Sequence, residues 1–180
     1  MKIMIASDIH GSAEHCRLLI ERMEAEQPEK LLLLGDLLYH GPRNDLLGEY
    51  APRSVSEQLN EIKDRVICVH GNCDAEVDQA MLEFSIMAEQ CLLFCGERVI
   101  YATHGHRYNE RSLPPLQKGD VLLTGHTHVP AYVDHGHFIY INPGSVSLPK
   151  GGSCHSYLML TDGLLEWKNL QGETYMTRRI

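Results

Sequence analysis

Residues 3–10 read IMIASDIH, an apolar run at positions 3–6 that is followed at once by Asp8 and His10. Short apolar runs with polar boundaries are typical of buried β-strands. Four later runs, at 31–34, 66–69, 99–102 and 121–123, also end near metal-binding residue types, which are Asp36, Asn72, His104, His126 and His128. The carboxyl ends of strands in a layered α/β fold converge on one rim, so we expect these seven side chains to meet there.

The segments between the runs predict helices in the first half of the chain. Ser12 is expected to cap a helix that reaches about position 26, and Ser54 with Glu57 forms a capping box for a helix toward position 63. Asp74 is expected to cap a short third helix.

The second half of the chain predicts mainly strands. Residues 131–134 and 138–142 flank His135-Gly136, and residues 157–161 and 164–170 flank Asp162-Gly163. Both segments predict β-hairpins, the second with a strong Asp-Gly turn signal. Strands of mixed connection with helices outside them predict an α/β fold of two packed sheets.

Length and charge narrow the classes of protein. At 180 residues the chain is expected to form a single domain spanning 1–180. Its formal net charge of -8 disfavours nonspecific nucleic-acid or anionic-lipid binding. The six cysteines show no CxxC pair, and the apolar runs are too short for a signal peptide or membrane span. We therefore expect reduced thiols, a cytoplasmic location and no membrane partner.

The candidate ligands comprise two carboxylates, one carboxamide and four imidazoles. This set suits two divalent ions, preferably Mn²⁺, with Zn²⁺, Fe²⁺ or Mg²⁺ as alternatives. Seven ligands exceed the need of one ion, whereas two ions bridged by Asp36 would use them all. Two such ions against two carboxylates leave a charge of about +2, which favours an anionic substrate. An ion pair about 3.5 to 4 Å apart also generates hydroxide and clamps phosphoryl oxygens, so we predict phosphate ester hydrolysis by a metal-bridging hydroxide.

The ordered motifs DxH, GD, GN, a lone His and GHxH resemble those of the calcineurin-like metallophosphoesterase superfamily. Here they are Asp8-Ile9-His10, Gly35-Asp36, Gly71-Asn72, His104 and Gly125-His126-Thr127-His128. The GNCD and THGH forms and the short chain are most similar to the small bacterial and archaeal YfcE-type phosphodiesterases. The resemblance covers residues 3 to about 128. It implies a four-layer α/β sandwich with two mixed β-sheets flanked by helices. It further implies one metal held by Asp8, His10, Asp36 and His128, and another held by Asp36, Asn72, His104 and His126.

One position departs from the superfamily pattern. Many members have a proton-donating histidine after the GN asparagine, whereas this chain has Cys73, which leaves Asn72, Cys73, Asp74 and His104 as candidate catalytic residues. A thiol is a weak acid, and general acid help contributes about 10² to 10⁴ in rate. We therefore predict a phosphodiesterase that acts on small diesters with low-pKa leaving groups.

Candidate substrate contacts lie in two polar segments. His40 and Arg43 belong to the loop HGPRND, for which a solvated loop is the alternative, and His106 follows His104. Two other functions stay open: a metal-dependent phosphomonoesterase or nucleotide hydrolase with His40 or His106 as proton donor, and a noncatalytic scaffold like the small retromer subunit. A homo-oligomer formed by pairing of the C-terminal strands at a sheet edge is compatible with the sequence.

Overall fold

The computed structural model describes residues 1–46 and 49–180. Six strands of the described chain form a first sheet in the order β11-β10-β9-β1-β2-β3. Their bounds are β1 Lys2–Ala6, β2 Lys30–Leu33, β3 Val66–Cys68, β9 Ser156–Thr161, β10 Leu164–Asn169 and β11 Thr174–Arg179. Strands β1, β2 and β3 are parallel, and β9 to β11 join them antiparallel, so the sheet is mixed.

The other five strands of the described chain form a second sheet, in the order β4-β5-β6-β8-β7. Their bounds are β4 Cys91–Cys95, β5 Arg98–Ala102, β6 Val121–Leu123, β7 Ala131–Asp134 and β8 Ile139–Asn142. Strands β5, β6 and β8 are parallel, whereas β4 and β7 pair antiparallel at the edges. Two mixed sheets, with helices outside the first of them, confirm the predicted α/β fold class.

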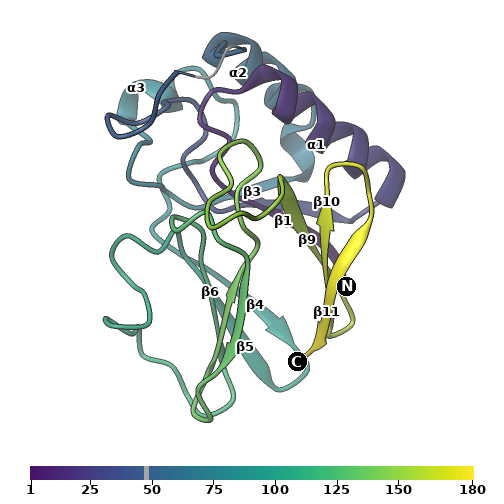
Figure 1. Cartoon of the computed structure of the whole chain (residues 1–180). Coiled ribbons are helices and arrows are strands. Elements are labelled where there is room, and N and C mark those ends of the chain that lie inside the picture. The colour runs from purple at the N-terminus through teal and green to yellow at the C-terminus, as the bar shows by residue number, and fades with distance from the viewer. Residues whose placement is uncertain (47–48) are drawn as a thin grey trace.

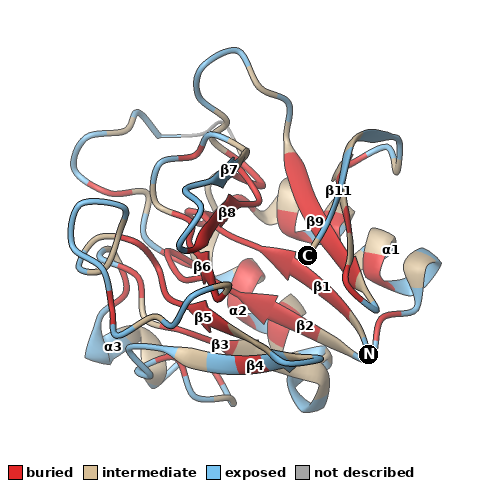
Figure 2. Ribbon diagram, turned by 90° about the horizontal axis from the view of Figure 1, so that it is seen from below, coloured by how far each residue is buried: buried red, intermediate tan, exposed pale blue. Residues whose placement is uncertain are grey.

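One core lies between the two sheets, and another lies between the first sheet and the helices (Figures 1 and 2). In β1, alternate residues face opposite ways: Ile3 and Ile5 pack toward the second sheet, and Met4 and Ala6 toward the helices. The helical layer is α1 (Ala13–Glu26), α2 (Pro52–Glu61), a 3-10 turn (Lys63–Arg65) and α3 (Glu76–Gln79). The outer face of the second sheet is covered by the segment that contains Tyr108 and Leu116.

Two helix boundaries test the capping predictions. The prediction for Ser12 is confirmed, since its hydroxyl accepts the backbone N–H of His15 at 3.3 Å and α1 ends at Glu26. The Ser54–Glu57 capping box is wrong, because α2 begins at Pro52 with Ala51 as its N-cap, so Ser54 lies inside the helix. Proline suits the first helical position, since its fixed φ fits the helix and the first turn needs no N–H there.

Both predicted hairpins are confirmed. Strands β7 and β8 pair antiparallel, as do β9 and β10. At the turn of the second hairpin Asp162 has φ 47° and Gly163 has φ 79°, the left-handed pair that a two-residue turn requires. In the described residues, no helix is long and apolar enough to span a membrane.

Candidate metal centre and active site

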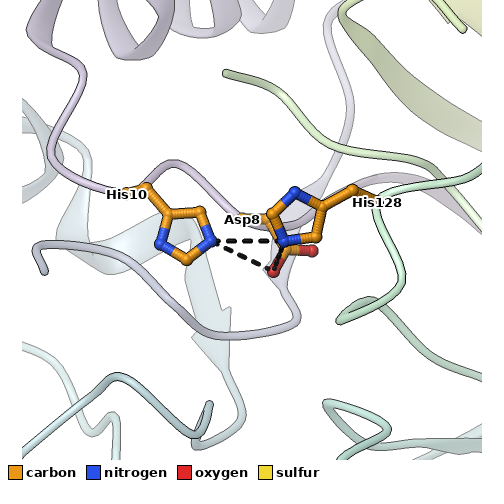
Figure 3. A group of neighbouring side chains, drawn as sticks. All are labelled: Asp8, His10 and His128. Atoms are coloured by element: carbon orange, nitrogen blue, oxygen red, sulfur yellow. Dashed lines mark hydrogen bonds and ion pairs between the residues drawn. The ribbon is translucent and has the colours of Figure 1, made fainter. Parts of the chain in front are cut away.

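All seven predicted ligands gather where strands β1, β2, β3, β5 and β6 end. The first group is Asp8, His10 and His128 (Figure 3). Oδ1 of Asp8 lies 3.6 Å from Nε2 of His10 and 3.3 Å from Nε2 of His128. The two histidine Nε2 atoms are 3.3 Å apart. These three side chains, from two strand ends on different sheets, therefore surround one point.

The second group lies beside the first and contains Asp36, Asn72, His104 and His126. Nε2 of His104 is 3.4 Å from Oδ2 of Asp36, 3.1 Å from Oδ1 of Asn72 and 3.2 Å from Nδ1 of His126. The same Oδ2 of Asp36 is 3.7 Å from Nε2 of His10, in the first group. Asp36 thus faces both groups, as a bridging ligand must.

Backbone carbonyls orient three of the four imidazoles. In each case a carbonyl oxygen lies 2.6 to 2.8 Å from Nδ1 of the ring. The pairs are Tyr39 with His10, Leu34 with His104 and Leu148 with His128. A carbonyl only accepts, so each Nδ1 donates its proton and each Nε2 turns toward the cluster. His126 is the exception, because its Nδ1 faces the cluster.

The donor set fits divalent cations. In their neutral form, with the Nδ1 protons engaged, His10 and His128 would point two Nε2 lone pairs at each other across 3.3 Å. Within the described chain, buried Oδ1 of Asp8 has no hydrogen-bond donor. Acceptors that face acceptors repel unless positive charge lies between them. The 3.3 Å separations of Nε2 of His128 from Nε2 of His10 and from Oδ1 of Asp8 also match those of atoms that bind one ion, each at about 2.0–2.2 Å from it.

The electrostatics of the cluster favour positive charge in the same way. Burial raises the pKa of Asp8, but the close approach of the His10 and His128 imidazoles holds it well below its usual value. Burial lowers the pKa of His104, yet Asp36, through its hydrogen bond and charge, and the charge of Asp8 raise it to about 9. The negative charge of the carboxylates thus favours protonated imidazoles. Bound cations would balance the same negative charge.

Most candidate ligands sit on a strained backbone. Of the seven non-glycine residues with positive φ in the described chain, five are candidate ligands: Asp8, His10, Asp36, His126 and His128. Left-handed φ costs an ordinary residue about 1–2 kcal/mol, and such strain clusters at functional sites. At Asp8, the hydroxyls of Ser145 and Ser147 donate to the strained residue's carbonyl at 2.8 and 3.1 Å, which holds it in place.

Two glycines allow the ligand loops to approach closely. A Cβ on Gly71 would lie 2.2 Å from Oδ1 of Asp36, and one on Gly125 would lie 1.9 Å from Oγ of Ser7 and 2.9 Å from Oδ2 of Asp8. Contacts this short leave no room for any side chain. The glycines of the GN and GHxH motifs are thus explained by packing against the carboxylates.

Asp74 has a different role from the helix cap that the sequence predicts. Helix α3 starts after Ala75, and the Asp74 carboxylate instead accepts three backbone N–H groups, from Asp36 at 2.9 Å, Leu37 at 2.8 Å and Gly71 at 2.8 Å. Burial raises the pKa of Asp74, which these donors partly oppose. Buried N–H groups need an acceptor, and this carboxylate satisfies three while it ties the Asp36 loop to the Asn72 loop.

Cys73 lies beside the shared carboxylate. Its backbone N–H donates to Oδ1 of Asp36 at 2.7 Å, and its Sγ accepts Nδ2 of Asn72 at 3.2 Å. Burial is the main cause that raises the pKa of the Cys73 thiol to about 12, and the charge of Asp36 is the next largest. Burial and the neighbouring carboxylates therefore favour the neutral thiol next to the cluster.

The cluster opens into a hollow of about 360 Å³, which we call the site hollow. Arg43, one of the predicted substrate contacts, lines it, as do Asn44, Thr127 and Lys150. Lys150 was not predicted, because a lone lysine in a Pro- and Gly-containing loop carries no motif. The two cationic side chains make the opening suitable for an anion.

The other two predicted substrate contacts lie apart from the site hollow. His40 packs against Tyr39 and Tyr50, with ring centroids 4.6 and 5.2 Å away. His106 lines a separate recess with His70, and its ring centroid is 5.4 Å from that of His104. Contact of His40 or His106 with substrate stays a prediction.

Comparison with known proteins agrees with this geometry. The model of the calcineurin-like phosphoesterase superfamily domain matches residues 1–162. The phosphodiesterase YfcE of Escherichia coli K12 is 46% identical over 165 residues, which are 92% of this chain and 90% of that protein. A solved structure of E. coli YfcE, described as a phosphoesterase, covers 100% of both chains with a TM-score of 0.96 and 43% identity.

A more distant structure shares only the fold. Vacuolar protein sorting 29 from Cryptosporidium parvum superposes with a TM-score of 0.64 at 18% identity, over 99% of this chain and 97% of that one. The family match and the identity to YfcE together place the chain: it belongs to the calcineurin-like phosphoesterase superfamily.

Proposed function

We propose that this phosphoesterase is a dinuclear-metal-dependent phosphodiesterase, with the cluster as its active site. The observation that carries the proposal is the shared carboxylate: Oδ2 of Asp36 faces His10 at 3.7 Å on one side and His104 at 3.4 Å on the other. One metal would be held by Asp8, His10, Asp36 and His128, and the second by Asp36, Asn72, His104 and His126. Both sheets contribute ligands, so a single domain spanning residues 1–180 would carry the whole site.

When bound, two such cations supply a hydroxide nucleophile near neutral pH and offset charge on the phosphoryl oxygens. Carboxylate, amide and imidazole ligands favour Mn²⁺, with Zn²⁺, Fe²⁺ and Mg²⁺ as alternatives. The residues of the chain supply the rest. Arg43 and Lys150 at the opening attract and orient the anionic substrate, and Asp74 keeps the loops of Asp36 and Asn72 together.

The identity of residue 73 supports esters with low-pKa leaving groups over alkyl esters. The thiol of Cys73 stands next to the cluster and is a poor proton donor, so the leaving group departs with its own charge. Leaving groups of low pKa tolerate this, whereas alkoxides do not. Small diesters with such groups are therefore the proposed substrates, in keeping with the name of the E. coli relative.

The alternatives are less well supported. A monoesterase or nucleotide hydrolase that uses His40 or His106 would need one of these rings in the site hollow, and neither lines it. A noncatalytic scaffold draws support from fold-level likenesses at 18% to 20% identity. It also gives no reason for seven ligand side chains to converge from five strand ends.

The test is a hydrolysis screen with added Mn²⁺ that compares bis(4-nitrophenyl) phosphate with 4-nitrophenyl phosphate and an alkyl phosphomonoester. We expect the parent protein to prefer the diester, and Asp36→Asn to abolish turnover. Cys73→His should raise monoesterase activity at least about tenfold, since it restores an acid. Cys95→His, at a half-buried cysteine on β4, is the control and should leave the preference unchanged. Full activity in Asp36→Asn would remove the dinuclear proposal.

A further inference from the structure

A second hollow, of about 420 Å³, lies beside the site hollow and is bordered by α2 and α3, which occupy the same end of the molecule (Figure 1). We call it the apolar hollow. Its wall is largely hydrophobic and includes Leu38, Tyr39, Tyr50, Cys73, Val77 and Met81. A volume of this size lies within the range of about 300–1,000 Å³ that is usual for small-molecule sites.

The apolar hollow adjoins the metal-ligand cluster. Cys73 lines both hollows. Tyr39 lines the apolar hollow, and its carbonyl accepts a hydrogen bond from Nδ1 of His10 at 2.8 Å. Tyr39 therefore contacts both the apolar hollow and a candidate metal ligand. A phosphate at the cluster therefore has apolar space for an attached group just past the Cys73 thiol.

The chemistry of the wall selects the kind of group. Val77, Met81 and Tyr39 are 71%, 45% and 41% exposed, which is unusual for apolar side chains that border one hollow. Two polar side chains in the same wall already have partners: the Ser56 hydroxyl donates to the Arg53 carbonyl at 2.8 Å, and an Asp78 carboxylate oxygen accepts the Ala75 N–H at 2.9 Å. The hollow thus offers contact area more than hydrogen bonds, and two tyrosines favour a flat ring.

We propose that the apolar hollow binds one apolar, ring-sized ester group of the substrate, so that the preferred substrates are phosphodiesters with at least one aryl-type group. This proposal rests on the proposed function, because it takes the cluster as the position of the phosphate. It adds a specificity element that the metal ligands themselves do not provide.

The experiment measures competitive inhibition of bis(4-nitrophenyl) phosphate hydrolysis by inorganic phosphate, methyl phosphate and phenyl phosphate, with Mn²⁺ present. In the parent protein, phenyl phosphate should bind about tenfold more tightly than methyl phosphate, because the ring is removed from water. Val77→Trp fills the hollow and Met81→Ala removes part of its wall, so both should bring this ratio close to one.

Matched controls lie outside the apolar hollow. Val133→Trp and Met87→Ala change side chains that are 40% and 39% exposed, and both should keep the parent ratio. An unchanged ratio in Val77→Trp and Met81→Ala, or an equal loss in the controls, would overturn the proposal for the hollow. Failure of inorganic phosphate to inhibit at all would instead contradict the phosphoesterase site itself, and with it this proposal.

Discussion

Replacement of Asp74 by Asn tests how the two ligand loops are held together. The carboxylate of Asp74 accepts N–H groups of Asp36, Leu37 and Gly71 at 2.8 to 2.9 Å. Asn keeps the shape but has one oxygen, so the N–H of Leu37 would face an amide NH₂. A buried donor without an acceptor costs about 1–3 kcal/mol, and each of the other two bonds would lose about 1 kcal/mol with the charge.

The neutral amide recovers part of this loss, since burial disfavours the charged carboxylate, as the raised pKa of Asp74 indicates. We therefore expect Asp74→Asn to lower the free energy of unfolding by about 2–4 kcal/mol, which corresponds to roughly 5–15 °C in Tm for a chain of this size. Diesterase activity should fall at least about tenfold at temperatures where the variant is folded, because Asp36 and Asn72 lose their mutual position. Thermal unfolding and kcat/KM of the Mn²⁺-loaded protein measure the two effects.

Asp120→Asn is the matched control. Asp120 is 6% exposed against 7% for Asp74, and its carboxylate also accepts two backbone N–H groups, from Val99 at 3.1 Å and Gln117 at 2.7 Å, away from the ligand cluster. It should lose stability and keep its activity. The reasoning is refuted if Asp74→Asn retains activity as well as Asp120→Asn does, or if its Tm does not change.

Three further changes test other parts of the structure. Gly125→Ala should lower the free energy of unfolding by about 1–3 kcal/mol and weaken Mn²⁺ binding, because its Cβ would lie 1.9 Å from Oγ of Ser7. A Mn²⁺ affinity equal to that of the parent protein, measured by titration calorimetry, would contradict this. At His10, with φ 48°, the metal-free Gly variant should be about 0.5–1 kcal/mol more stable than the Ala variant, and denaturant unfolding that gives the opposite order would exclude backbone strain there. Burial, then the charge of His155, lowers the pKa of His15, so His15 stabilises the fold above its usual pKa of 6.5 and this contribution is lost as pH falls below it. The parent should therefore lose more stability between about pH 7 and 5 than His15→Gln does, and parallel pH profiles would disprove the effect.

The sequence predicts well that the candidate ligands converge, because strand ends meet by a general rule. The rule for parallel strands brings Asp8 and Asp36 together at the ends of β1 and β2, and the packing of the second sheet adds His104 from the end of β5. The supporting groups follow no such rule. Ser145 and Ser147 donate to the carbonyl of Asp8 although they lie 137 and 139 positions away in the sequence. Only the folded structure reveals these two hydrogen bonds.

Asp74 and strand β4 show two other limits of the sequence. The position of Asp74 before a helix fits a cap, but its three N–H partners come from other loops and cannot be read locally. Strand β4 is absent from the prediction because it is an edge strand, with Leu92 and Phe94 exposed at 45% and 69%, so its residues do not form an all-buried run like those of β1 or β2. The predicted capping box of Ser54 likewise fails against the stronger preference of Pro52 for a helix start.

The most direct test of the shared Asp36 carboxylate is a titration of metal-free protein with Mn²⁺, in which bound metal and diesterase activity are followed together. We expect two Mn²⁺ per chain and activity that rises fully only with the second equivalent. Asp36→Asn should bind the ions more weakly and show no turnover. Full diesterase activity at one equivalent per chain would contradict the dinuclear site.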